Sequence, residues 1–171
     1  YYAAEKGFAE ICKMLIDAGA DINYQGYQEK TPLMLSAENG HSETVRLFIN
    51  NKADILLKDE QQKTSLHAAA AGGLDWLVEY CVKNGIDVNT PDKYGGIPLG
   101  LALFERNYKT AKLLLKLGSD VNKKGLSDNL DVVDAEESLI TAKTNYYSAI
   151  VQHLIAKMRL QQVSGTLDIP F

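Results

Sequence analysis

Residues 63–74, KTSLHAAAAGGL, combine one histidine, four alanines and a glycine pair. Small residues allow a backbone to come close either to a ligand or to a neighbouring helix, so this stretch by itself decides nothing. Two similar stretches decide the fold: KTPLMLSAENGH begins at Lys30, and GIPLGLALFERN begins at Gly96. The three stretches follow one another at steps of 33 residues, which indicates an internal repeat.

A second landmark keeps the same step. The segments GADIN, KADIL, GIDVN and GSDVN begin at Gly19, Lys52, Gly85 and Gly118. The period of 33 residues, the TPLH-like opening and the GADVN-like closing resemble the ankyrin repeat over about residues 1–125. This resemblance implies an all-α solenoid in which each repeat is a helix, a turn, a second helix and a finger loop.

The residues themselves support that unit. Thr31 stands where a helix N-cap accepts a backbone hydrogen bond, and Pro32 follows at the first helical position, where its missing N–H costs nothing. Gly40 and Gly73 stand where the first helix would end in the left-handed conformation. Gly85 is expected to end a second helix in the same way.

The apolar pattern predicts the buried faces. The first helices have a large-then-small face: Leu33, Leu35, Ser36 and Ala37, then Leu66, Ala68, Ala69 and Ala70. The second helices are predicted to bury Val45, Leu47, Phe48 and Ile49, then Val78, Tyr80, Cys81 and Val82, then Ala111, Leu113, Leu114 and Leu115. Cys12 and Cys81 fall in these slots two repeats apart, so we expect two buried thiols and no disulfide.

The repeat divides the chain, taken as a single ankyrin-repeat domain over 1–171. We expect a partial repeat over 1–25, full repeats over 26–58, 59–91 and 92–124, a degenerate capping repeat over 125–161 and a tail over 162–171. The first repeat lacks its finger and its TPL opening, so we interpret the sequence as a fragment or as one whose earlier residues are missing. The acidic stretch 127–138 is either a solvated face or a docking patch.

Composition excludes several classes of function. The formal charge of −4 provides no basic field for nucleic acid, and no apolar run reaches the ~18 residues that a membrane span needs. Two distant cysteines suggest neither a disulfide framework nor a zinc site. We therefore expect a soluble monomer in a reducing compartment, cytoplasmic or nuclear, that binds no cofactor.

No motif for catalysis is found either. The family resemblance gives His67 a structural role, in which the ring bridges neighbouring repeats by hydrogen bonds. No Ser/Asp or Cys/His arrangement surrounds it, and Gly72-Gly73 lacks the Lys-Ser/Thr ending of a phosphate loop. Three scattered histidines make no metal site. We predict that the chain is not an enzyme and has no metal.

The resemblance also implies where a partner binds. In ankyrin proteins the finger tips and the exposed side of the first helices form a concave binding face. The residues predicted to lie there are Tyr27, Gln28, Lys30, Glu38, Asn39, Lys58, Glu60, Gln61, Lys63, Ala71, Gly72, Lys93, Tyr94, Phe104 and Glu105. Tyr94 and Phe104 either form one apolar spot for a partner or pack internally, and Trp76 either packs on the preceding loop or marks a lateral site.

The predicted function is a protein-interaction module that binds another protein through this concave face. The alternative is a regulatory or targeting ankyrin segment of a larger enzyme, channel or effector whose activity lies outside these residues. The full-length reading frame would discriminate between the two.

Overall fold

The computed structural model describes residues 1–120, which belong to the unit Tyr1–Leu130. Within them the chain forms eight α-helices, a 3-10 turn η1 (Tyr27–Glu29) and no strand. The helices come in pairs: α1 (Tyr2–Glu5) with α2 (Ala9–Asp17), α3 (Pro32–Glu38) with α4 (Ser42–Asn50), α5 (Ser65–Ala71) with α6 (Asp75–Lys83), and α7 (Pro98–Phe104) with α8 (Tyr108–Lys116). The predicted all-α fold is confirmed. The predicted capping repeat 125–161 and the tail 162–171 lie outside the described residues.

The helices begin and end where the repeat predicts. Thr31 Oγ1 accepts a hydrogen bond from the backbone N–H of Met34 at 3.2 Å, and Pro32 is the first residue of α3. Gly40 has φ +71° between α3 and α4, and Gly73 has φ +70° between α5 and α6. Because side chains rarely adopt this left-handed conformation, glycine allows each sharp turn between paired helices.

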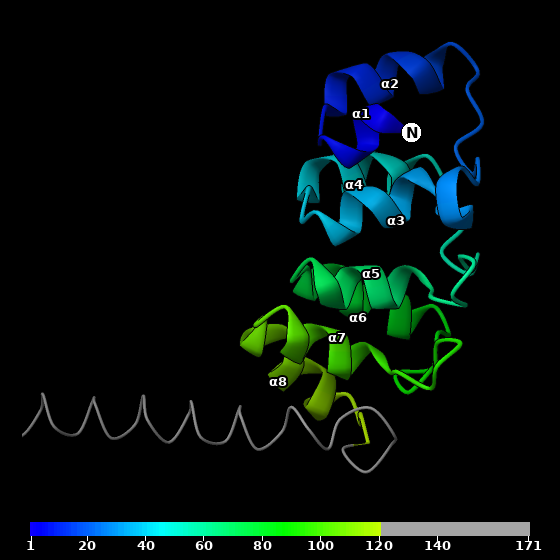
Figure 1. The fold of residues 1–171 in the computed structure, drawn as a ribbon. Coiled ribbons are helices and arrows are strands. Elements are labelled where there is room, and N and C mark those ends of the chain that lie inside the picture. The colour runs from blue at the N-terminus through cyan, green and yellow to red at the C-terminus, as the bar shows by residue number, and fades with distance from the viewer. Residues whose placement is uncertain (121–171) are drawn as a thin grey trace, which may run out of the picture. The chain divides into compact units, whose positions relative to one another are not determined.

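The first helices stack on one another in the order α1, α3, α5, α7 (Figure 1). Their large-then-small faces are buried as predicted, and small side chains let these helices approach closely. Gly72 is the tightest point of this packing. A Cβ atom there would overlap the carbonyl oxygen of Ala37 in the preceding repeat. Close packing between repeats therefore accounts for the small residue at 72.

Two histidines connect neighbouring repeats. His67 Nδ1 accepts a hydrogen bond from the backbone N–H of Thr64 at 3.1 Å, so Nε2 carries the proton and donates to the carbonyl of Gly96 at 3.4 Å. This confirms the structural role predicted for His67. His41 Nε2 bonds to the carbonyl of Glu5 at 2.9 Å. Each ring reaches from its own repeat to a neighbour and satisfies a backbone carbonyl there.

The second helices α4 and α6 contact each other through larger side chains. The Arg46 guanidinium lies 4.1 Å from the centre of the Trp76 ring, and Trp76 Nε1 donates a hydrogen bond to Ser42 Oγ at 3.0 Å. Trp76 therefore packs on the first turn and body of α4, in the preceding repeat. A cation over an indole face and a satisfied N–H both favour this position.

The prediction was wrong for two residues of the second helices. Tyr80 is 36% exposed and Leu115 is 42% exposed. Tyr80 is two residues from the buried Val78, and Leu115 directly follows the buried Leu114. Because such close neighbours point in different directions around a helix, these two side chains lie beyond the buried stripe.

Both cysteines are buried and unbridged, as predicted. Burial raises the pKa of Cys81 to about 12, so its thiol stays protonated at neutral pH. Cys81 therefore behaves as a small apolar side chain of the α6 core.

Gly72→Ala provides a test of the close packing. Gly72 has φ −86°, a conformation that alanine adopts freely, so at a spacious site this substitution would stabilise the fold. Here the added methyl group has no room, and we expect the free energy of unfolding to fall by about 1–3 kcal/mol in denaturant titrations. Gly85→Ala is the control: space around it is open, and its φ of +94° alone should cost about 1–2 kcal/mol. An unchanged or higher stability of Gly72→Ala would contradict the packing account.

His67 should make the stability depend on pH. Burial, and to a lesser extent the charge of Lys63, lower its pKa from 6.5 to about 4. As the pH falls, the unfolded chain therefore binds the proton before the folded one does. Stability is complete above pH 6.5 and declines toward pH 4, with a slope of up to ~1.4 kcal/mol per pH unit.

The matched variant is His67→Met, because Met34 occupies the equivalent position one repeat earlier. Loss of the ring's hydrogen bonds should lower stability at pH 7 by about 1–3 kcal/mol. The gap between wild type and His67→Met should then narrow between pH 6.5 and 4 in denaturant titrations. A gap that stays constant over this range would mean that His67 is not held neutral.

Candidate protein-binding surface

Buried or half-buried carboxylates shape the fingers of the third and fourth repeats. Asp59 Oδ1 accepts hydrogen bonds from the backbone N–H groups of Gln61 at 2.9 Å and Lys63 at 2.8 Å. Asp92 Oδ1, 33 residues later, accepts from Tyr94 at 2.9 Å and Gly96 at 2.8 Å. An aspartate that bonds its own following backbone fixes a tight turn. The sequence analysis predicted polar turns here but missed these two residues, although their spacing repeats that of the helices.

Neighbouring fingers are joined through their backbones. The N–H of Glu60 donates to the carbonyl of Gln28 at 3.0 Å, and the N–H of Lys93 donates to the carbonyl of Gln61 at 2.8 Å. The side chain of Gln25 adds a bond to the carbonyl of Lys58 at 2.9 Å. The bonds at Glu60 and Lys93 have the same register, so the three fingers form one connected edge.

The second finger is held by an aromatic side chain in place of a carboxylate. Gly26 takes the position of Asp59, and a Cβ atom there would collide with the ring of Tyr1. The Tyr1 hydroxyl donates to the carbonyl of Tyr27 at 2.9 Å, and its ring meets Tyr2 and Tyr24 edge-on. Because the first repeat lacks a finger in the sequence, this tyrosine cluster was not predicted.

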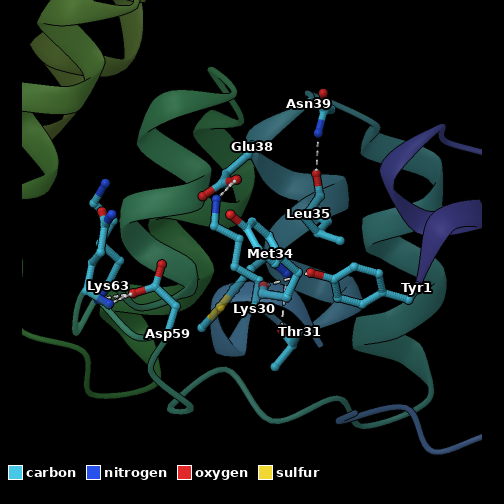
Figure 2. A network of polar contacts seen from close by, with 11 residues as sticks. Tyr1, Lys30, Thr31, Met34, Leu35, Glu38, Asn39, Asp59 and Lys63 are labelled. Carbon is cyan, nitrogen blue, oxygen red and sulfur yellow. Dashed lines mark hydrogen bonds and ion pairs between the residues drawn. The ribbon is translucent and has the colours of Figure 1, made fainter. Parts of the chain in front are cut away.

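Several predicted binding residues are already bonded within the second repeat (Figure 2). Lys30 Nζ lies 2.7 Å from Glu38 Oε2, with both side chains about one fifth exposed, at 20% and 24%. The side-chain amide of Asn39 donates to the carbonyl of Leu35 at 2.8 Å. One repeat later, Lys63 replaces Lys30 and Ala71 replaces Glu38, so this ion pair is not repeated there.

The fourth repeat presents the most exposed aromatic side chains of the predicted set after Tyr27. Tyr94 at the finger is 73% exposed, and Phe104 at the end of α7 is 72% exposed. Their neighbours Lys93 and Glu105 are also exposed. The ring pairs recorded in residues 1–120 both involve Tyr1, so a joint spot formed by Tyr94 and Phe104 stays a prediction.

The structure places every predicted residue either in a finger or at the C-terminal end of a first helix. Glu38, Ala71 and Phe104 are the last residues of α3, α5 and α7, and the residue after each is the C-cap. The remaining members are in or beside the three fingers. Whether a partner contacts them stays a prediction.

Two other kinds of site were searched for in the described part of the chain. Among residues 1–120, no three His, Cys, Asp or Glu side chains come together in a way that could hold a metal ion. No helix in the same range has the length and apolar character needed to cross a membrane.

Comparison with known proteins agrees with the repeat and the helix pairs. A family model described as ankyrin repeats (3 copies) matches residues 1–92 and 54–125. No curated protein matches the chain. Ankyrin repeats are generally protein-interaction modules, and domains built from them are typically non-catalytic. The period of 33 residues, the stacked helix pairs and the family match together show that this chain belongs to the ankyrin-repeat family.

Proposed function

We propose that this domain binds a protein partner through the surface formed by its fingers and the C-terminal ends of α3, α5 and α7. The observation that carries the proposal is the exposure of Tyr94 and Phe104, which are 73% and 72% exposed in the fourth repeat. Aromatic side chains supply much of the binding energy at protein interfaces, because each buries a large area with few rotatable bonds.

The hydrogen bonds of the fingers support the proposal. Asp59 and Asp92 fix the turns, and the backbone bonds from Glu60 and Lys93 connect one finger to the next. A surface that is already ordered loses little conformational entropy on association. The fingers are therefore suited to bind without first folding.

The proposed setting follows from the buried thiols. Cys12 and Cys81 are unbridged, which fits a reducing compartment such as the cytoplasm or nucleus. We propose a monomeric module without a cofactor of its own. It could serve alone or as the regulatory or targeting part of a larger protein, and the same surface would bind in either case.

The double variant Tyr94→Ala/Phe104→Ala tests the surface. Removal of both rings should leave the helical circular dichroism spectrum intact, because both side chains are exposed. Affinity for a partner captured from extracts of the source cell should fall at least tenfold, the scale of a lost interface hot spot of about 2 kcal/mol.

The matched control removes two exposed apolar side chains elsewhere. Phe8 and Met14 on and beside α2 are 55% and 69% exposed, away from the fingers. Phe8→Ala/Met14→Ala should keep the affinity measured for the wild type by biolayer interferometry. Equal loss in both double variants, or no loss in the first, would show that the surface is wrongly assigned.

A further inference from the structure

The second and third repeats differ at one pair of equivalent positions on the proposed surface. In the second, the Lys30 amine is paired with Glu38 at 2.7 Å. In the third, Lys63 keeps the lysine, but Ala71 has no carboxylate to offer it. The third repeat therefore keeps the cation of this pair and lacks its anion.

The Lys63 amine makes no ion pair within residues 1–120. The pairs recorded there are Lys6 with Glu5, Lys30 with Glu38 and Lys109 with Asp75. The contact of Lys63 with Asp59 uses the backbone N–H of Lys63. Its side chain is only partly exposed, so water screens its charge less than that of a fully exposed lysine.

The neighbouring residues leave room above this lysine. Ala71 and Gly72, at the end of α5, carry a methyl group and no side chain, where the repeats on either side carry Glu38-Asn39 and Phe104-Glu105. A partner's main chain can therefore come closest to the surface at the third repeat.

We propose that a carboxylate of the bound partner takes the place in the third repeat that Glu38 holds in the second, and pairs with the Lys63 amine above Ala71. This inference rests on the proposed function and adds the chemistry of the partner. A single lysine beside Asp59 supplies one positive charge, which suits one carboxylate better than the several donors that a phosphate needs.

The next repeat specifies a second feature of the partner. Phe104 stands in the position of Ala71, one repeat further along the stack. Stacked helices lie about 8–10 Å apart, and an extended chain advances about 3.3 Å per residue. A partner segment that crosses both repeats would thus carry an acidic residue and an apolar residue about two to four positions apart.

A phage-displayed library of random 12-residue peptides, selected on the folded full chain, provides the probe. Selected peptides should share an Asp or Glu with an apolar residue two to four positions away. Fluorescence anisotropy with synthetic copies should show an affinity loss of about tenfold or more for Lys63→Gln. Ala71→Glu should lower the affinity similarly, because the new carboxylate pairs with Lys63 as Glu38 does with Lys30.

Lys112→Gln removes the same charge from an exposed position on α8 and should keep the wild-type affinity. Selected peptides without a shared acidic residue, or a selection without binders, would overturn the inference, as would equal binding by wild type, Lys63→Gln and Ala71→Glu. If such peptides still lose affinity for Tyr94→Ala/Phe104→Ala, the proposed function stands without the carboxylate. Peptides insensitive to every one of these variants except the Lys112 control would contradict both.

Discussion

The close approach of consecutive first helices is the constraint on which the described structure depends. At Gly72 the carbonyl of Ala37 leaves no room for a methyl group, and the alanines of α5 are buried against their neighbours. A short helix pair cannot bury its apolar face alone, so stability comes from the contact between repeats. His67 and His41 add polar contacts across the same boundaries.

This packing also determines the geometry of the proposed binding surface. Because each repeat follows the last at the same step, the fingers come into register and their backbones bond to one another. The backbone is thus nearly the same from one repeat to the next, and the side chains differ. At one repeated position the surface changes from Glu38 to Ala71 to Phe104, that is, from charged to nearly flat to aromatic.

Much of the fold could be predicted from the sequence, because the period, the caps and the apolar pattern act locally in every repeat. The ends of α3 and α5 and the buried alanines are of this kind. Contacts between repeats were less predictable: Trp76 bonds to Ser42 about one repeat away, and Tyr1 supports the finger at Tyr27 from a repeat that lacks its own finger. The exposure of Tyr80 and Leu115 depends on how helices turn against their neighbours, which a list of apolar residues does not determine. The residues of the candidate surface could be located, but that Lys30 is paired while Lys63 is not became visible only in three dimensions.

Hydrogen exchange of the domain, free and bound to a partner, tests the central claim most directly, because it reports which backbone segments become protected. The account predicts that protection increases in residues 57–64 and 90–97 and at the C-terminal ends of α5 and α7. Protection confined to the second helices α4, α6 and α8, with the fingers unchanged, would contradict it.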